Sequence, residues 1–279
     1  MKSRLPIRYR RDEPRGLRGG RTYNARTMRA AFPFIGSLLI AAVVAGCAME
    51  GVPGARGGDR AASDDPFVRA RQQMVSDQLV ARGITDPDVL EAMRKVPRHR
   101  FVPAEVAPQA YEDHPIPIGY DQTISQPFIV AYMTQALDLV SSDRVLEVGS
   151  GSGYQAAVLA EIVQEVYTIE IVPELARSAA ATIEQLGYGN VKVKEGDGFR
   201  GWPEHAPYDG IIVTAAPTYI PKPLIDQLAI NGRLIIPVGD WYQELVIVTK
   251  TAEGVTERRT LPVRFVPMTG EVTRNPNAR

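Results

Sequence analysis

Beyond about residue 140, short apolar runs alternate along the chain with stretches of helical spacing. The short runs, bounded by turn-forming residues, predict buried strands at 145–148, 166–170, 191–194, 209–214 and 233–238. The stretches between them predict helices at 156–162, 173–186 and 221–230. The end of the chain instead predicts an antiparallel strand pair, 244–251 and 255–265.

Helix-start signals come before this alternating region. An aspartate followed by proline, typical of an N-cap and first helical position, occurs twice and predicts helices over 65–82 and 86–96. Residues 98–125 are rich in proline and are predicted to be mostly irregular. A further helix is predicted over 127–140. These helices form an N-terminal helical segment ahead of the strands.

Strands that alternate with helices indicate an α/β fold built on a doubly wound, mostly parallel sheet, here with an antiparallel C-terminal strand pair. In such sheets, ligands bind at the carboxyl ends of the strands. We expect residues 65–279 to form a single domain. Residues 1–64 are predicted to be a signal-like segment followed by a flexible linker.

Charge divides the chain at the same place. Residues 1–60 carry 12 Lys and Arg against 4 Asp and Glu, whereas the remainder carries 20 against 28. An acidic body repels a polyanion, which argues against nucleic acid as a partner. The three histidines, His99, His114 and His205, stand in unrelated contexts, and no cluster has metal-ligand spacing, so we predict no metal site.

The basic N-terminal segment leads into an apolar run, 31–45, that is short for a transmembrane span and resembles a secretory signal. It ends in Val44-Ala45-Gly46-Cys47, which resembles a bacterial lipobox and predicts membrane anchoring through a lipidated Cys47, the only cysteine. Residues 50–64 lack periodicity and indicate a flexible linker. A disordered extension upstream of the folded protein is the alternative interpretation.

The strand 145–148 leads directly into a glycine-rich turn, in the sequence RVLEVGSGSGY over 144–154. Gly149, Gly151 and Gly153 would let a ligand approach the backbone, and the following helix start offers free N–H groups. The G-x-G-x-G spacing disfavours the G-x-G-x-x-G turn of an NAD-dependent dehydrogenase. With Glu147 ahead of the glycines, placed to accept a hydrogen bond from an amine, the turn resembles the first motif of S-adenosylmethionine (SAM) methyltransferases. A glycine turn without a ligand is the remaining alternative.

Two acids follow at the ends of the next strands. Glu170 lies about twenty residues beyond the glycines, where an acid can bind the hydroxyls of a ribose. Asp197 stands between glycines and is placed to meet an adenine amine, while Gly198 lets the ring approach. A solvated strand-end acid and a turn aspartate are the alternative interpretations.

Several segments in order resemble the protein-L-isoaspartate O-methyltransferase family over about residues 67–272. The segment Thr123-Ile124-Ser125-Gln126-Pro127 is the most specific match. The other segments include 96–98, 101–103, 115–119, 196–198, 212–217, 237–239 and 264–267. This resemblance implies a Rossmann-like SAM methyltransferase fold and SAM as methyl donor. It also implies methylation of the free carboxylate of L-isoaspartyl residues in proteins and peptides, which initiates repair through a succinimide; use of D-aspartyl residues stays open.

By the same resemblance, Ser125 is the active-site serine, and Gln122, Thr123 and Ile124 lie with it against the donor. We expect Ser125 to orient the carboxylate through its hydroxyl, with a helix cap as the alternative role. No general base is needed, because a carboxylate is ionised at neutral pH. The sequence Asp240-Trp241-Tyr242 departs from the small or acidic loop usual after Pro-Val-Gly, so the substrate rim is expected to differ.

Three other functions stay open from the sequence. They are a methyltransferase for a small-molecule carboxylate, the NAD-dependent dehydrogenase, and a lipid-anchored module that binds damaged protein without turnover. Localisation is open as well. The family resemblance implies a cytoplasmic enzyme, in keeping with the cytoplasmic synthesis of SAM, whereas the segment ending at Cys47 predicts an exported, membrane-anchored form.

Overall fold

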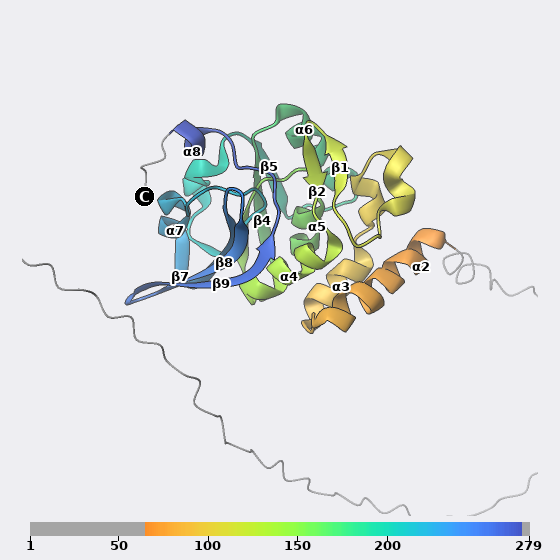
Figure 1. Ribbon diagram of the computed structural model, residues 1–279, viewed down its shortest axis with the longest axis horizontal. Coiled ribbons are helices and arrows are strands. Elements are labelled where there is room, and N and C mark those ends of the chain that lie inside the picture. Colours follow the sequence, from red (N-terminus) through yellow and green to blue (C-terminus); the bar gives the residue numbers. More distant parts are fainter. Residues whose placement is uncertain (1–64, 275–279) are drawn as a thin grey trace, which may run out of the picture. The chain divides into compact units, whose positions relative to one another are not determined.

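The computed structural model describes residues 65–274 (Figure 1). The predictions for residues 1–64, including the signal-like segment, the linker and the lipidation of Cys47, lie outside the described residues. Within residues 65–274, no helix is long and apolar enough to cross a membrane.

A seven-stranded sheet in the order β5-β4-β3-β6-β7-β8-β9 forms the centre of the fold. Neighbours from β5 to β7 are parallel, whereas β8 and β9 run antiparallel at one edge. The strands span β3 Arg144–Val148, β4 Glu165–Glu170, β5 Val191–Glu195, β6 Tyr208–Val213, β7 Leu228–Gly239, β8 Gln243–Thr251 and β9 Gly254–Val263. The predicted fold class is confirmed, and the strand order reverses between β3 and β6, which creates a crevice at their carboxyl ends.

Each face of the sheet has its own apolar core. Val145 of β3 faces a core shared with helices α3 (Pro87–Lys95), α4 (Pro127–Leu137) and α5 (Tyr154–Ala160). Leu146, one residue on, faces a second core. Helix α6 (Pro173–Gln185) contributes to the first core, and α7 (Lys222–Asp226) and α8 (Glu271–Arg274) contribute to the second. Successive strand residues therefore serve opposite layers, as the period of two requires.

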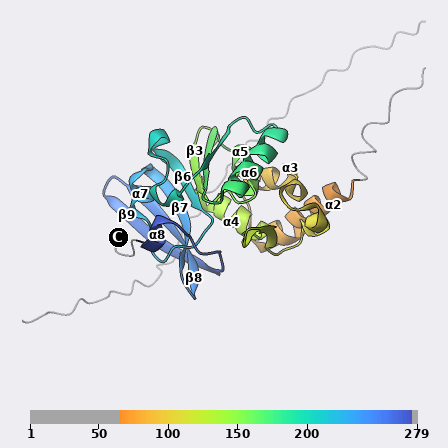
Figure 2. The same cartoon turned by 90° about the horizontal axis from the view of Figure 1, so that it is seen from above.

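The N-terminal helices form as predicted from their caps. Asp65 accepts a hydrogen bond from the Phe67 N–H, and helix α2 (Pro66–Gln73) continues through a π-helical segment and a 3₁₀ turn to Arg82. Gly83 ends it with a left-handed φ of 90°. Asp86 caps α3 in the same way. In Figures 1 and 2 the orange helices α2 and α3 lie beside α4 and α5, away from β8 and β9.

Two predictions of local structure were wrong. Residues 98–125 contain a small antiparallel hairpin, β1 (Ile116–Gly119) with β2 (Gln122–Ile124), as well as two 3₁₀ helices. The helix predicted over 221–230 stops at Asp226, because Leu228 is already fully buried as the first residue of β7, opposite Tyr208. Burial beside a neighbouring strand overrode the local helical pattern here.

Candidate active site

The glycine turn between β3 and α5 folds back on the end of β4. The backbone N–H groups of Gly149 and Ser150 both donate to the Ile169 carbonyl, at 2.8 and 3.2 Å. Gly149, Gly151 and Gly153 have φ values of 99°, 52° and 88°, in the left-handed region that favours glycine. The sequence thus needs glycine at these positions for the path of the chain itself, before any ligand is considered.

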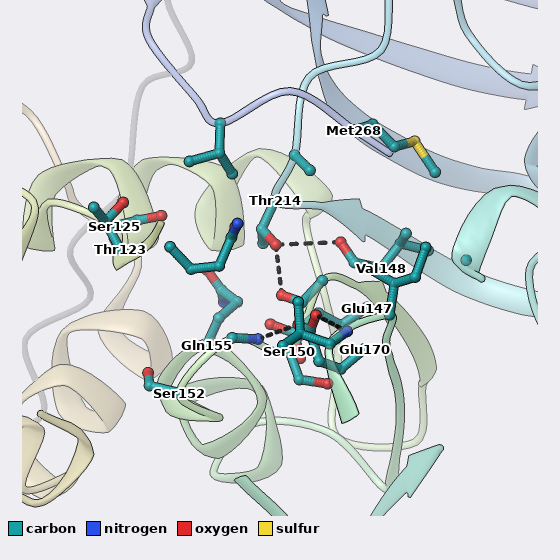
Figure 3. Close-up of a pocket in the computed structure, with 18 of the residues that line it drawn as sticks. Thr123, Ser125, Glu147, Val148, Ser150, Ser152, Gln155, Glu170, Thr214 and Met268 are labelled. Atoms are coloured by element: carbon teal, nitrogen blue, oxygen red, sulfur yellow. Dashed lines mark hydrogen bonds between the residues drawn. The ribbon is translucent and has the colours of Figure 1, made fainter. Parts of the chain in front are cut away.

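Thr214, just beyond β6, closes the turn from the other side of the crevice. Its hydroxyl donates to the Gly149 carbonyl at 2.5 Å and lies 3.2 Å from the Val148 carbonyl (Figure 3). A Cβ added at Gly149 would collide with the Thr214 hydroxyl. The strands that flank the point of reversal are therefore joined directly at their carboxyl ends.

Glu170, at the end of β4, holds the middle of the glycine turn. Its carboxylate accepts the Gly151 N–H at 2.7 Å and the Val172 N–H at 2.9 Å, and only 5% of the residue is exposed. A carboxylate has about four acceptor sites, so two hydrogen bonds leave capacity for hydroxyl groups of a ligand.

Glu147 is fully buried on β3 below the turn. One carboxyl oxygen accepts a 2.5 Å hydrogen bond from Thr168, whose hydroxyl lies 2.6 Å from that of Ser150. The other oxygen is buried without a partner among the described residues. Burial raises the pKa of Glu147 to about 8; the bond from Thr168 opposes this rise, and the charge of Glu170 adds to it. An unpartnered acid oxygen on the cleft wall is suited to a cationic ligand group.

These groups line a cleft at the carboxyl edge of the sheet. Of the residues predicted from the sequence, its walls include Gln122, Thr123, Ile124, Ser125, Glu147, Gly149, Gly151, Glu170 and Gly198. In Figure 3, Thr123 and Ser125 lie on one side of the cleft and Met268 lies on the other. The tertiary structure therefore brings the two sequence motifs, 122–125 and 144–154, to one site.

Gly153 and Asp197 do not line this cleft. A Cβ at Gly153 would lie 3.3 Å from that of Ala179 on α6, so this glycine allows close helix packing. The Asp197 carboxylate accepts the N–H groups of Phe199, at 2.9 Å, and Glu271, at 2.6 Å. Contact of either residue with a donor molecule stays a prediction.

A second cleft adjoins the first. Four residues line both clefts, namely Thr123, Ser125, Thr214 and Val266. The second cleft continues between Pro115, ahead of β1, and the segment 262–266 at the end of β9. A molecule in each cleft would meet its neighbour at Ser125 and Thr214.

Ser125 is not a helix cap. Gln126 occupies the N-cap position of α4 and makes no side-chain capping bond. Within the described residues the Ser125 hydroxyl has no hydrogen-bond partner. The Ser125 carbonyl, in contrast, accepts a 2.7 Å bond from the guanidinium of Arg98.

Arg98 is fully buried, and its guanidinium anchors the loop that carries Ser125. It also donates to the Ala110 carbonyl at 2.7 Å and lies over the Tyr154 ring at 4.8 Å. Burial lowers the pKa of Arg98 to about 10, so the group remains charged at neutral pH. Arg98 therefore joins the loop that carries Ser125 to the helix that follows the glycine turn.

Sequence reasoning missed several wall residues of the first cleft. Thr214, Gln155 and Met268 line it but were not proposed as site residues. Thr214 could have been found, since it follows the strand across the point of reversal. Met268 lies one residue beyond the matched segment 264–267, and its place on the wall depends on the folded chain, in which its N–H donates to the Ala216 carbonyl at 2.9 Å.

Among the described residues, few ionisable side chains line the two clefts that meet at Ser125 and Thr214. Among residues 65–274, the only acids that line either cleft are Glu147 and Glu170, both on the wall of the first, and the second offers hydroxyls and Arg264. Within the part of the chain that the structure describes, no histidine or lysine that could act as a general base lines either cleft. Among residues 65–274, no group of His, Cys, Asp or Glu is arranged to hold a metal ion. The site suits an acceptor that is already ionised.

Comparison with known proteins gives a consistent result. The family model of protein-L-isoaspartate(D-aspartate) O-methyltransferases matches residues 69–273. A protein-L-isoaspartate O-methyltransferase of Gloeobacter violaceus is 60% identical over 200 residues, covering 71% of this chain and 98% of the relative. One from Picosynechococcus is 56% identical over 206 residues, covering 74% and 93%.

Solved structures agree with the sequence matches. A protein-L-isoaspartate O-methyltransferase superimposes with a TM-score of 0.67 and 29% identity, covering 74% of this chain and 69% of the other. A Plasmodium falciparum protein in complex with S-adenosyl-L-homocysteine gives a TM-score of 0.63 and 28% identity, covering 71% and 98%.

Proposed function

Because this chain belongs to the protein-L-isoaspartate(D-aspartate) O-methyltransferase family, we propose that its two adjoining clefts hold the methyl donor and the isoaspartyl acceptor. The chain is a SAM-dependent methyltransferase that acts on the free carboxylate of L-isoaspartyl residues in damaged proteins and peptides. The single observation that carries the assignment of the clefts is that they share Ser125 and Thr214.

The first cleft fits the donor. Its wall carries the unpartnered buried oxygen of Glu147 and the Glu170 carboxylate, whose two backbone hydrogen bonds leave acceptor sites for hydroxyl groups. We assign Glu147 to the amino group of the donor and Glu170 to its ribose hydroxyls. When bound, SAM supplies an electrophilic methyl group, which passes to the acceptor carboxylate as the C–S bond breaks and a C–O bond forms.

The residues of the chain act by orientation and exclusion of water. A carboxylate acceptor is ionised at neutral pH, so no residue has to remove a proton. We assign the free hydroxyl of Ser125 to the acceptor carboxylate, which it orients by donating a hydrogen bond. The negative charge of the carboxylate and the positive charge of the sulfonium neutralise each other during the transfer. The rate enhancement therefore comes from alignment of the two groups and from exclusion of water. In the ester, the neighbouring backbone nitrogen then attacks the ester carbonyl and displaces methanol to form a succinimide, whose hydrolysis returns part of the damaged residue to aspartate.

The test uses isotopically labelled SAM with an isoaspartyl peptide and its normal aspartyl twin. Label should enter only the isoaspartyl peptide and should be lost on base treatment, as expected of a methyl ester. Equal labelling of both peptides, or labelling of small carboxylic acids alone, would overturn the assignment of the acceptor.

We also propose that an exported form is anchored through lipidated Cys47. The support is the sequence Val44-Ala45-Gly46-Cys47 after a short apolar run. The cytoplasmic origin of SAM argues for the opposite location. Mass spectrometry of the native protein separates the two: a mature N-terminus at Cys47 carrying acyl chains supports export, and an unprocessed chain in the cytoplasmic fraction rules it out.

A further inference from the structure

The turn that joins β7 to β8, residues 240–242, presents two aromatic side chains to solvent. Trp241 is 99% exposed and Tyr242 is 67% exposed, more than any other large apolar side chain among the described residues. Single exposed apolar residues are ordinary, but two adjacent large aromatic residues give a substantial area able to bind another molecule.

The geometry of the turn accounts for this exposure. Gly239 has a φ of 138°, and a Cβ there would collide with the Tyr242 carbonyl. Its N–H donates to the Pro217 carbonyl at 3.0 Å, and Gly239 pairs with Gln243 in the β7–β8 ladder. The chain therefore makes a tight turn between the paired residues Gly239 and Gln243. Both aromatic residues lie outside the ladder, where neither is buried by the sheet.

The turn is connected to the wall of the second cleft. The buried Gln243 donates through its amide to the Phe265 carbonyl at 3.2 Å and accepts the Phe265 N–H at 2.6 Å. Phe265 and its neighbours Arg264 and Val266 line that cleft. Since β7 is parallel to β6, the turn also lies at the edge of the sheet that carries Thr214. The Gln243–Phe265 hydrogen bonds therefore join the base of the turn to the wall of the second cleft.

We propose that Trp241 and Tyr242 form an auxiliary contact surface, the aromatic turn, for polypeptide flanking the isoaspartyl residue. The proposal rests on the assigned function and adds a substrate preference for long or unfolded chains with apolar residues near the damaged site. The occupant is a polypeptide because the turn is continuous with the acceptor cleft through Gln243. The acidic character of residues 61–279, together with Asp240 beside the aromatic pair, disfavours an anionic membrane.

The first test compares Trp241→Ala with the parent on two isoaspartyl peptides. One is just long enough to fill the cleft, and the other carries about four further residues on each side, including leucine, which extends its reach by about 13 Å per side. We expect kcat/KM for the long peptide to fall about 5- to 30-fold, the range for removal of an aromatic anchor. The effect should lie in KM, and turnover of the short peptide should stay within about twofold of the parent.

Val255→Ala serves as the matched control. Val255 is an exposed apolar residue near the start of β9, and its truncation should leave the kinetics of both peptides unchanged. Tyr242→Ala should resemble Trp241→Ala with a smaller effect. An equal loss for short and long peptides would overturn the proposal, because it would mean that the turn acts only by shaping the cleft.

Tryptophan fluorescence gives a readout independent of activity. The chain has two tryptophans, and Trp202 packs against the rings of Tyr167 and His205 at 5.5 and 5.0 Å. In a Trp202→Phe variant, only Trp241 reports, and the long peptide should shift its emission to the blue whereas the short one should not. An unchanged spectrum with saturating long peptide would overturn the proposal.

Two further outcomes would assign the aromatic turn to another occupant. Loss of binding to phosphatidylcholine vesicles in Trp241→Ala, with peptide kinetics unchanged, would identify a membrane surface. A change in sedimentation alone would identify a second copy of the chain. If the parent methylates no isoaspartyl peptide at all, the assigned function itself fails, which separates that failure from equal use of both peptide lengths.

Discussion

Replacing Glu147 by glutamine tests whether the buried acid below the glycine turn is the counter-ion of the donor. Glu147→Gln keeps the shape of the side chain and its acceptor for Thr168, which lies 2.5 Å away. It removes the ability to ionise. An amide NH₂ group would replace the carboxyl oxygen that already has no partner, at the same buried position.

The magnitude follows from proton linkage. Burial raises the pKa of Glu147 in the folded protein to about 8, from an ordinary value of 4.5. Between these values the folded chain binds one more proton than the unfolded chain, so the free energy of unfolding falls as the pH rises. This group contributes a slope of about 1.4 kcal/mol per pH unit, or roughly 2 kcal/mol between about pH 6 and 7.5. Glu147→Gln should lose that contribution to the slope.

Donor binding is expected to shift Glu147 from the protonated form, which burial favours, to the charged form. An ammonium beside Glu147 favours its charged form, so binding at neutral pH should release up to one proton. Calorimetry in two buffers of different ionisation enthalpy measures this release. Glu147→Gln should release none and should bind SAM about 10- to 150-fold more weakly, from the loss of a charged hydrogen bond of about 1.5–3 kcal/mol.

The matched control is Glu253→Gln, in the exposed turn between β8 and β9, which should behave as the parent in both measurements. Urea unfolding of the ligand-free protein at several pH values gives the slope. The same slope in parent and Glu147→Gln, together with no proton release by the parent, would refute the role of this residue.

Three further substitutions test the remaining parts of the site. Ser125→Ala should lower kcat roughly ten- to a thousandfold with SAM affinity and melting temperature unchanged, because the hydroxyl has no partner within the described residues; unchanged kcat would contradict its role. Gly151→Val should abolish SAM binding, measured by calorimetry, and should cost about 1–2 kcal/mol of stability at a φ of 52°. Its Cβ has space, 3.5 Å from Ile118, so circular dichroism should show a folded protein, and parental affinity would refute the glycine-turn assignment. Arg98→Lys should lower kcat at least tenfold with little change in SAM affinity, because a lysine cannot bond the Ser125 and Ala110 carbonyls in the same fork geometry; parental kcat would show that Arg98 serves stability alone.

The local sequence determined most of the elements and one half of the site. Asp65 and Asp86 predicted their helix starts because an aspartate cap acts on N–H groups two or three residues away. The glycine turn was predictable for the same reason, since left-handed φ values are a requirement of each residue alone. The position of Glu170 at the end of β4 was predictable because a strand of ordinary length fixes where its carboxyl end lies.

Only the tertiary structure decided the features that depend on contacts between distant segments. Leu228 joins β7 instead of continuing a helix because Tyr208 of β6 lies beside it. Thr214 reaches the glycine turn, and Arg98 reaches Ser125, across 65 and 27 residues of sequence. The pKa of Glu147 rises because the fold removes it from water, which its neighbours in sequence do not do. Sequence patterns record what a residue requires of its own backbone, whereas burial and the meeting of two clefts arise only when the sheet brings separate strands together.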